Sequence, residues 1–194
     1  MSSFNRVTLS QYFSLIGEDN AQERLTAFSS PKNAEIEEFV HKSALEFTKR
    51  KITITHLLIN DDFDIVAMYA LTHKAIFIDG SLLTSSLKKK LSKYVLPEPN
   101  SETFKISGFL IAQLGKNFAI DGGRTITGNE IMQSVFEVID SVQAQIGGRI
   151  IYLECENKQP LLDFYQNEAN NFKLFASRTS ALDGTVYEQL IKIF

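Results

Sequence analysis

The stretch DGGRTITGNEIM (residues 121–132) has the residue types and the spacing to bind an anion. Thr127 and Glu130 are related as Thr-x-x-Glu, the spacing of a capping box, which predicts that Gly128 opens a helix. Backbone N–H groups of a first helical turn attract negative charge, and glycines let a phosphate approach because they have no Cβ atom. The stretch is therefore a candidate phosphate-binding loop, and a capped structural turn is the alternative.

The stretch does not match the common nucleotide-binding loops. Gly123 and Gly128 have the spacing of a P-loop, but Asn129 and Glu130 stand where that motif has lysine and then serine or threonine. The dinucleotide fingerprint G-x-G-x-x-G is absent as well. Hydrolysis of ATP or GTP is therefore not expected.

The other reactive side chains show no pattern of a metal or nucleophile site. The histidines, His41, His56 and His73, have no metal-ligand spacing. The only cysteine, Cys155, lies in the apolar run IIYLEC and has no partner for a disulfide. We therefore predict no metal site and a buried, reduced thiol.

Composition predicts one ordinary globular domain. The chain has 194 residues, of which 44% are hydrophobic, enough for a single domain over residues 1–194. It has no run of about 18 apolar residues and no export signal, which predicts a cytoplasmic protein without membrane association. The formal net charge of -3 argues against nucleic acid as a partner. The lysine-rich segment 87–93 is predicted to be a short helix with its leucines inward and its lysines in solvent, and a phosphate-binding patch is the alternative.

The elements that must position the glycine-rich stretch follow from hydrophobic periodicity and turn residues. Apolar side chains at three- and four-residue steps predict an amphipathic helix over residues 34–51. A second apolar stripe predicts a long helix after Gly128, formed by Ile131, Val135, Ile139, Val142 and Ile146 and ended by Gly147 and Gly148. The predicted strands are residues 52–59, 64–71, 74–78, 104–114, 149–156, 172–177 and 185–194, and a short helix covers residues 160–167.

These elements predict a mixed α/β sheet. Residues 52–59 and 64–71 should form an antiparallel hairpin around the turn NDDF. The later strand–helix–strand crossover should make residues 104–114 and 149–156 parallel neighbours. The glycine-rich stretch would then lie at the carboxyl edge of the sheet, where α/β proteins bind ligands.

The order of these motifs resembles the GNAT superfamily of N-acetyltransferases. LIAQLGKN, GGRTITG and NEIMQSVFEVI are similar to its fourth strand, pyrophosphate loop and following helix, and IIYLECEN and LLDFY to its next strand and tyrosine-bearing helix. TAFSSPKNAEIEEFVHKSALEF, THLLI and IVAMYAL are similar to the N-terminal half of a bacterial, toxin-like subset. The resemblance covers most of the chain. It implies an α+β fold with a mostly antiparallel central sheet, one parallel, splayed pair of strands, and helices on both faces.

The loop motif departs from the family pattern. Gly123 stands in the place of arginine or glutamine, Ile126 in that of the first glycine, and only Gly128 is in register. Asn171 replaces the glycine that precedes Phe172, and asparagine tolerates a left-handed backbone better than most residues. The ordered set of strands and helices is therefore more specific than the loop.

The resemblance implies acetyl-CoA as the cofactor, with its pantetheine arm on strand backbone and its pyrophosphate on the glycine-rich stretch. Strand amides suit an amide-bearing arm, and a helix start suits a diphosphate. Arg124 would add a charge-assisted bond, and an exposed loop arginine is the alternative. The implied cofactor-binding residues are Leu114, Gly115, Lys116, Gly123, Arg124, Thr125, Ile126, Thr127, Gly128 and Asn157.

Tyr165 is the residue to which the resemblance assigns chemistry, as the general acid that protonates the departing CoA thiolate. A phenol with a pKa of about 10 is protonated at neutral pH and can donate to sulfur. Without the resemblance, its place beside Phe164 would indicate an ordinary half-buried core tyrosine. Glu154 and Glu156 share one face of a predicted strand, and either could take the proton of an amine. Solvated strand glutamates are the alternative.

The sequence therefore predicts an acetyl-CoA-dependent N-acetyltransferase acting on a primary amine of a small molecule, peptide or protein, with a homodimer left open. One alternative is a CoA-binding module with weak turnover, because the loop motif is degenerate. The other is a toxin of a toxin–antitoxin pair that acetylates aminoacyl-tRNA. The acidic balance argues against this toxin, because tRNA binding normally needs basic surface.

Overall fold

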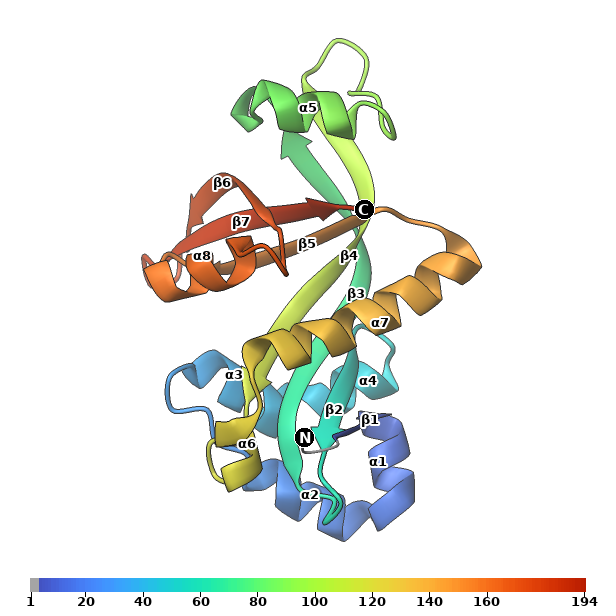
Figure 1. The fold of residues 1–194 in the computed structure, drawn as a ribbon, viewed down its shortest axis with the longest axis vertical. Helices are drawn as coiled ribbons and strands as arrows, with labels where there is room; N and C mark the ends of the chain where they lie inside the picture. Colours follow the sequence, from blue (N-terminus) through green and yellow to red (C-terminus); the bar gives the residue numbers. More distant parts are fainter. Residues whose placement is uncertain (1–3) are drawn as a thin grey trace. The chain divides into compact units, whose positions relative to one another are not determined.

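The computed structural model describes residues 4–194 (Figure 1). Its residues group into two compact units. The first unit contains the chain up to Thr72 together with Ile111–Val138, and the second contains His73–Leu110 and Ile139–Phe194. The single domain over residues 1–194 therefore stays a prediction. Over the part of the chain that is described, no helix is both long and apolar enough to cross a membrane.

Seven strands form the sheet, in the order β1-β2-β3-β4-β5-β7-β6. It is mostly antiparallel with one parallel pair, which confirms the predicted fold class. Two long strands, β3 and β4, contribute residues to both units. The bounds are β1 (Asn5–Thr8), β2 (Ile54–Ile59), β3 (Ile65–Asp79), β4 (Thr103–Lys116), β5 (Ile150–Glu156), β6 (Lys173–Thr179) and β7 (Val186–Ile193).

The predicted hairpin is confirmed, since β2 pairs antiparallel with β3. The separate third strand at residues 74–78 was wrong, because β3 runs unbroken to Asp79. No glycine, proline, asparagine or aspartate stands between Leu71 and Ile78 to turn the chain, so the strand continues. The predicted strand ended before the polar pair Thr72 and His73. The structure continues through them because this part of β3 is only partly buried and leaves polar side chains in solvent.

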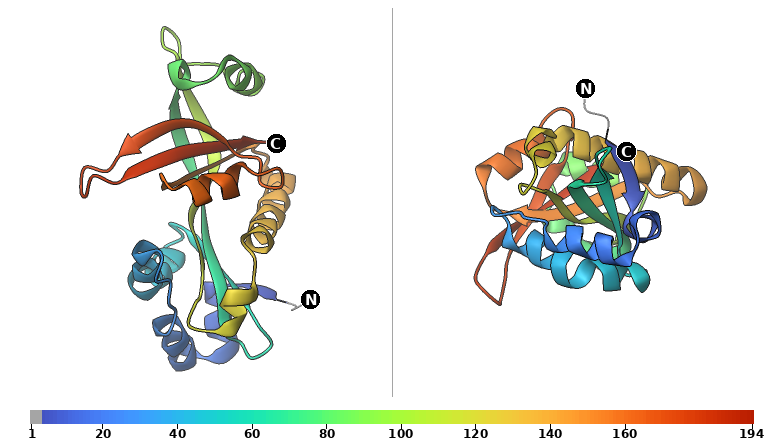
Figure 2. Two further views of the ribbon diagram at one scale, coloured as in Figure 1. Left: turned by 60° about the vertical axis from the view of Figure 1, so that its left-hand side comes forward. Right: turned by 90° about the horizontal axis from the view of Figure 1, so that it is seen from below.

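In the first unit, helices cover both faces of the strands. α1 (Leu9–Ile16), α2 (Glu18–Thr26), α3 (Ala34–Glu38) and α4 (Ala44–Lys49) lie on one face. α6 (Asp121–Thr125) and the start of α7 (Gly128–Ile146) lie on the other (Figure 2). Residues 65–71 of β3 are all buried, as expected for a strand covered on both sides. The helix predicted over residues 34–51 contains a π-helical turn, Phe39–Ser43, which separates α3 from α4.

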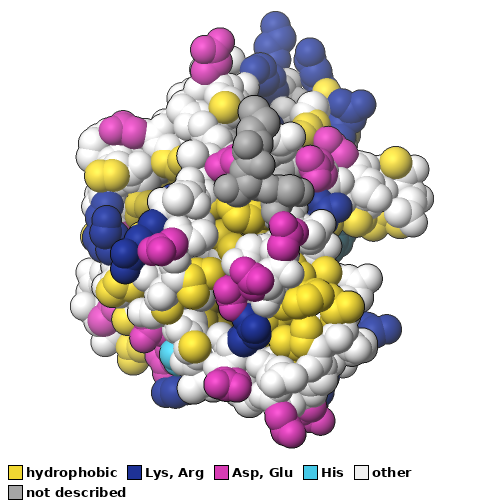
Figure 3. All heavy atoms as spheres, turned by 60° about the horizontal axis from the view of Figure 1, so that its bottom comes forward, with side chains coloured by type: hydrophobic (Ala, Val, Ile, Leu, Met, Phe, Trp, Pro, Cys, Tyr) yellow, Lys and Arg dark blue, Asp and Glu magenta, His cyan; other side chains and the backbone are white. Residues whose placement is uncertain are grey.

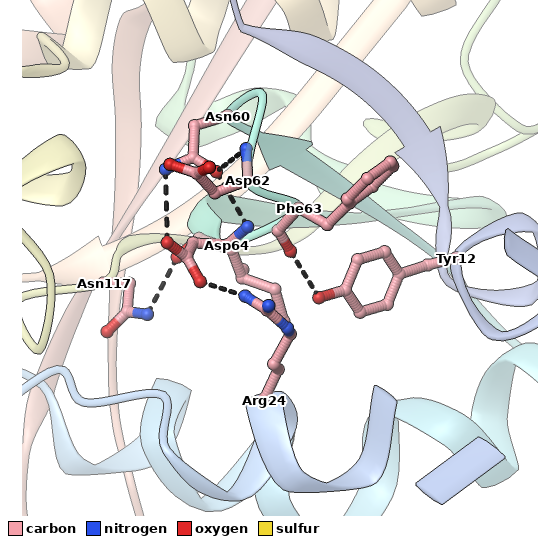
Figure 4. A network of polar contacts seen from close by, with 8 residues as sticks. Tyr12, Arg24, Asn60, Asp62, Phe63, Asp64 and Asn117 are labelled. Carbon is pink, nitrogen blue, oxygen red and sulfur yellow. Dashed lines mark hydrogen bonds and ion pairs between the residues drawn. The ribbon is translucent and has the colours of Figure 1, made fainter. Parts of the chain in front are cut away.

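The β2–β3 turn of the first unit is held by side chains (Figure 4). Asn60 Oδ1 accepts from the backbone N–H of Asp64 at 2.8 Å, and Phe63 takes a left-handed backbone with φ of 61°. Tyr12 donates its hydroxyl to the Phe63 carbonyl at 2.7 Å, and Arg24 forms an ion pair with Asp64. Burial raises the pKa of the Tyr12 phenol to about 12, so this donor stays protonated. The predicted turn at NDDF is confirmed.

The second unit is built on β5, β7 and β6, with parts of β3 and β4 (Figure 1). β7 pairs antiparallel with both β5 and β6. α8 (Gln159–Gln166) packs against β5, and α5 (Ser85–Leu91) buries Leu87 and Leu91, which leaves its lysines outward as predicted. The core of this unit consists of Ile78, Leu83, Leu87, Leu91, Phe104, Ile106, Ile150 and Ile191.

The long helix α7 runs from Gly128 to Ile146 and begins where the capping box predicted. Ile131, Val135 and Ile139 are buried, but Ile146 is 69% exposed, so the predicted stripe is wrong at its last position. The helix ends before Gly147, whose φ of 77° is a left-handed value that suits glycine. β5 follows almost at once, so β4 and β5 are neighbours, as the crossover predicted.

Candidate functional site

The predicted site residues are divided between the two units. All of those from Leu114 to Gly128 belong to the first unit, whereas Asn157 and Tyr165 belong to the second. Each group is therefore described within its own unit.

In the first unit, the capping box at the start of α7 is formed as predicted. Glu130 Oε2 accepts from the backbone N–H and from the hydroxyl of Thr127, both at 2.7 Å, and Thr127 Oγ1 accepts from the Glu130 N–H at 3.2 Å. The two bonds from Thr127 hold the pKa of the Glu130 carboxyl below its usual range. Gly128 is the first residue of α7, and within residues 4–194 its N–H meets no hydrogen-bond acceptor.

The rest of the glycine-rich stretch is not an open loop. Asp121–Thr125 forms a short helix, α6, and the Thr125 hydroxyl donates to the Gly122 carbonyl at 3.0 Å. Ile126 is buried, so its side chain belongs to the core. Arg124 is exposed and lies 3.7 Å from the Asp121 carboxylate. Two groups of the stretch that can meet a ligand are the Arg124 guanidinium and the Gly128 N–H.

The glycines of α6 serve packing, and that their backbone groups also contact a phosphate stays a prediction. A Cβ atom on Gly123 would lie 1.5 Å from the Asn117 carbonyl oxygen, a distance that no side chain can adopt. A Cβ atom on Gly122 would lie 3.1 Å from a methyl of Val66. Gly123 is required because the end of β4 passes directly against α6.

Asn117, which the sequence analysis missed, fixes this region. Its Nδ2 donates to the Ile65 carbonyl at 2.8 Å, and its Oδ1 accepts from the backbone N–H groups of Ser29 and Ala119, both at 3.0 Å. Its own N–H donates to the Val66 carbonyl at 2.9 Å. The side chain is buried and ties β3 and the segment before α3 to the chain that enters α6. An asparagine between a strand and a turn was the only signal that could have found it.

Replacing Asn117 by aspartate should lower the free energy of unfolding by about 2–4 kcal/mol at neutral pH, because a carboxylate would face the Ile65 carbonyl and lose a donor. The loss should shrink as the pH falls, since a protonated carboxyl can donate again. Urea unfolding at several pH values measures this. Asn157→Asp, at an exposed position, is the matched control and should change stability by less than about 0.5 kcal/mol.

The predicted pantetheine contacts lie at the end of β4. Gly115 is buried, and a Cβ atom there would lie 2.8 Å from the Ile36 side chain, so this glycine allows α3 to approach the strand. Leu114 and Lys116, which flank it, are half-buried. That these backbone groups bind the pantetheine arm stays a prediction.

In the second unit, Tyr165 is a buried residue of α8. Its ring packs against Phe164 at 4.9 Å between centroids and edge-on against Phe172 at 6.0 Å. Burial, and to a smaller extent the charge of the Cys155 thiolate, raise the pKa of the phenol well above its ordinary value. Over residues 4–194, no protein group is hydrogen-bonded to the Tyr165 hydroxyl. The residue is therefore a protonated phenol at neutral pH with an uncommitted donor.

The turn after α8 holds Tyr165 in place. Asn171 has a left-handed φ of 53°, as expected for a residue in the place of glycine. The Phe172 N–H then donates to the Tyr165 carbonyl at 3.0 Å. The Asn170 side chain donates to the carbonyl of the residue before Tyr165, and Lys192 donates to the Asn170 carbonyl at 2.8 Å.

The two glutamates considered as general bases have cations of their own. Glu154 forms an ion pair with Arg178 and accepts from the Tyr152 hydroxyl at 2.5 Å, and Glu156 forms an ion pair with Lys158. Burial raises the pKa of the Glu154 carboxyl, but the hydrogen bonds it accepts outweigh burial and hold the pKa below its usual range. These contacts favour the structural alternative for both residues.

Cys155 is buried, as predicted, and burial followed by the charge of Glu188 raises the pKa of its thiol to about 11. Glu188 lies opposite Cys155 on β7 and is itself buried. The sequence analysis missed Glu188, although its place two residues before the buried Leu190 could have indicated an inward position. Asn157, the predicted cofactor contact after β5, donates its backbone N–H to the Val186 carbonyl at 2.9 Å.

Within residues 4–194 no three His, Cys, Asp or Glu side chains are placed to hold a metal ion. His56 lies in the first unit, stacked on Tyr69 with 5.0 Å between ring centroids. Burial, helped by the charge of Arg6, lowers the pKa of its imidazole to about 4. His56 is therefore neutral and structural at neutral pH.

Acid should destabilise the protein through His56. The unfolded imidazole takes a proton near pH 6.5 and the folded one only near pH 4, so the contribution to stability is complete above about pH 6.5 and is lost as the pH falls to about 4. The loss should be at most about 3 kcal/mol. This loss is measured as the difference in the free energy of unfolding between the wild type and His56→Phe across this pH range. If the two proteins showed the same dependence on pH, His56 would have no such role.

Comparison with solved structures identifies proteins that have the same fold. No protein-family model and no curated protein sequence matches this chain. AtaT complexed with acetyl-methionyl-tRNAfMet has a TM-score of 0.62 and 14% identity, over 95% of this chain and 94% of that chain. A tyrosine-to-phenylalanine mutant of KacT has a TM-score of 0.64 and 12% identity, over 97% and 95%. AtaTR bound with AcCoA has a TM-score of 0.61 and 14% identity, over 97% and 95%. The chain therefore has the GNAT fold of AtaT and KacT, as the sequence resemblance predicted.

Proposed function

We propose that this protein is an acetyl-CoA-dependent N-acetyltransferase whose acceptor is the amino group of an aminoacyl-tRNA. The observation that carries the proposal is the fold shared with AtaT over 95% of the chain, in a structure complexed with acetyl-methionyl-tRNAfMet. The structure of AtaTR bound with AcCoA supports the acetyl donor.

The first unit contains groups that fit the diphosphate of acetyl-CoA. The 19-residue helix α7 directs its positive dipole end toward Gly128, whose N–H has no acceptor within residues 4–194, and Arg124 adds an exposed cation. The thioester supplies an activated acetyl group. Thr127 and Glu130 hold the helix start rigid through the capping box, so the Gly128 N–H keeps its direction.

The second unit contributes the proton donor. Tyr165 stays protonated at neutral pH and has an uncommitted hydroxyl, which is what protonation of a leaving thiolate requires. Phe164 and Phe172 keep water from most of the ring, and the Asn170–Lys192 contacts fix α8. A general acid that is buried and fixed needs little rearrangement before it donates.

The distribution of charge supports a nucleic-acid acceptor, although the net charge argued against one. Residues 73–110, here called the basic segment, contain six lysines and three acidic residues, although the whole chain carries -3. Figure 3 shows that basic and acidic side chains are unevenly distributed over the face it presents. The net charge, which argued against nucleic acid, averages the basic segment with the rest of the chain.

Several basic side chains of the second unit are available for a phosphate backbone. Within residues 4–194, Lys89, Lys90 and Lys93 form no ion pair. Lys90 and Lys173 line a cavity of about 230 Å³ that has no carboxylate among its lining residues. Phe77 is 62% exposed, which offers a surface for base stacking, and Lys105 lies 5.7 Å from the centroid of its ring. The small-molecule, peptide and protein acceptors predicted from sequence have no comparable support.

A CoA-binding module with weak turnover is the second candidate. It is favoured by the internal bonds of the glycine-rich stretch, since Thr127 and Glu130 already satisfy each other's N–H groups and Gly123 serves packing. Such a protein would bind acetyl-CoA and release no thiol with any acceptor.

Thiol release from acetyl-CoA tests the proposal. Aminoacyl-tRNA pools, uncharged tRNA and a panel of small amines are compared, and acetyl groups on the aminoacyl ends are identified by mass spectrometry. We expect release with aminoacyl-tRNA at a much lower KM than with any small amine, no release with uncharged tRNA, and growth arrest when the protein is expressed in a bacterial host. Release with the small amines but not with aminoacyl-tRNA would reject the acceptor, and no release with any of them would favour the binding module.

A further inference from the structure

Three polar or thiol side chains form a row across the second unit. Cys155 on β5 lies directly opposite Glu188 on β7, and Glu188 lies directly opposite Ser177 on β6. Residues directly opposite in antiparallel strands present their side chains to the same face. Lys192, four residues after Glu188 and on the same face of β7, donates to the carbonyl of Asn170 in the turn that holds α8, and α8 packs against β5. The row and the proposed general acid therefore share one face of the sheet.

Glu188 differs from the other carboxylates of these strands. It is 5% exposed and accepts one hydrogen bond, from the Ser177 hydroxyl at 2.6 Å. Within residues 4–194 it has no cationic partner at salt-bridge distance, whereas Glu154 and Glu156 each have one. A buried carboxylate is normally paired with a cation, because burial removes the water that stabilises its charge.

The free oxygen of Glu188 can still be reached. The described side-chain atoms that are both sealed from solvent and without a hydrogen bond belong to Thr53, Thr55 and Gln143. Glu188 is not among them, although only its Oε2 accepts a hydrogen bond. A small cationic group can therefore approach the second oxygen.

We propose that Glu188 binds the ammonium group of the amine acceptor, on the face of β5 and β7 that carries Cys155 and Tyr165. This inference rests on the proposed function and adds the residue that selects a cationic acceptor. The carboxylate supplies the counter-charge, and the Ser177 hydroxyl orients it. Glu154 and Glu156 cannot take this role, since they lie on the opposite face of β5 and are paired.

Binding is tested first without turnover. Methionine amide, which carries an ammonium group, and N-acetylmethionine amide, which does not, are titrated into ¹⁵N-labelled protein. We expect methionine amide alone to shift the backbone resonances of Cys155, Ser177 and Glu188. Glu188→Gln should weaken this binding at least about tenfold, and Glu168→Gln, which removes an exposed charge from the same unit, should leave it unchanged. Equal binding of both amides, or an equal effect of both variants, would overturn the inference.

Turnover then separates charge recognition from a structural role. Glu188→Gln should raise the KM for methionine amide or aminoacyl-tRNA at least about tenfold and leave the KM for acetyl-CoA unchanged. The KM for an aromatic amine that is uncharged at the assay pH should not change in Glu188→Gln. An equal loss of activity with the charged and the uncharged acceptor would indicate a general structural defect and would overturn the inference. Thermal unfolding checks that the variant folds, and Ser177→Ala, which keeps the carboxylate, should have a smaller effect.

Failure of this inference is distinguishable from failure of the proposed function. If the wild type acetylates aminoacyl-tRNA and Glu188→Gln does so with unchanged KM, Glu188 does not bind the ammonium group and the proposed function stands. If no acceptor is acetylated but methionine amide binds through Glu188, the inference stands and the acetyltransferase activity is rejected.

Discussion

Replacing Tyr165 by phenylalanine is expected to lower the turnover number about 10²- to 10⁴-fold, the usual contribution of a general acid. The substitution removes one hydroxyl, and no protein group within residues 4–194 is hydrogen-bonded to it. The ring can keep its packing against Phe164 and Phe172, so the fold and the affinity for acetyl-CoA should remain nearly unchanged. Steady-state thiol release and calorimetric titration of acetyl-CoA measure the two quantities separately.

Tyr152→Phe is the matched control for this experiment. Tyr152 is also a tyrosine of the second unit, but its hydroxyl is committed to Glu154 on the opposite face of β5. Its loss should change turnover by no more than about twofold. An unchanged rate in Tyr165→Phe, or an equal loss in both variants, would remove Tyr165 from the proposed mechanism.

Gly123→Ala should cost more stability than any other single methyl addition in the first unit. The new Cβ atom would lie 1.5 Å from the Asn117 carbonyl oxygen, which is backbone and cannot move without breaking the Asn117 contacts to β3. We expect the free energy of unfolding to fall by more than about 3 kcal/mol, as for severe overpacking. Urea unfolding measures the loss, and the same variant should bind acetyl-CoA poorly because α6 leads directly into the start of α7.

Gly122→Ala is the control for this prediction. Its Cβ atom would meet a methyl of Val66 at 3.1 Å, and a side chain can shift by a few tenths of an ångström. The cost should be about 1 kcal/mol or less. Similar losses in both variants would mean that the close approach of β4 to α6 is not what requires glycine at position 123.

Local patterns predicted most of the elements from residue 34 onward, but not β1, α1, α2 or α6. The capping box places the start of α7 because Thr127 and Glu130 interact with each other and with nothing distant. The hairpin, the crossover and the closing strands likewise follow from turn residues and periodicity. The π-helical turn at Phe39–Ser43 was not predictable in this way, since apolar side chains at three- and four-residue steps continue across it.

The features that the sequence did not predict depend on contacts between residues that are far apart in the chain. Gly123 suggested a phosphate loop from sequence, whereas its need for glycine comes from Asn117, which reaches it only after β4 has paired in the fold. The role of Glu188 depends on the registers that place it opposite Cys155 and Ser177, and no spacing in the sequence reveals those partners. Net charge is likewise a poor guide to a local surface, because it averages the basic segment with the acidic remainder.

Every step of the proposed reaction depends on acetyl-CoA binding at the start of α7. Isothermal titration of acetyl-CoA into the purified protein tests this most directly. We predict one saturable site per chain, competed by CoA and weakened at least about fivefold by Arg124→Gln, which removes the exposed cation of α6. A titration without saturable heat, and without competition by any CoA species, would contradict the account.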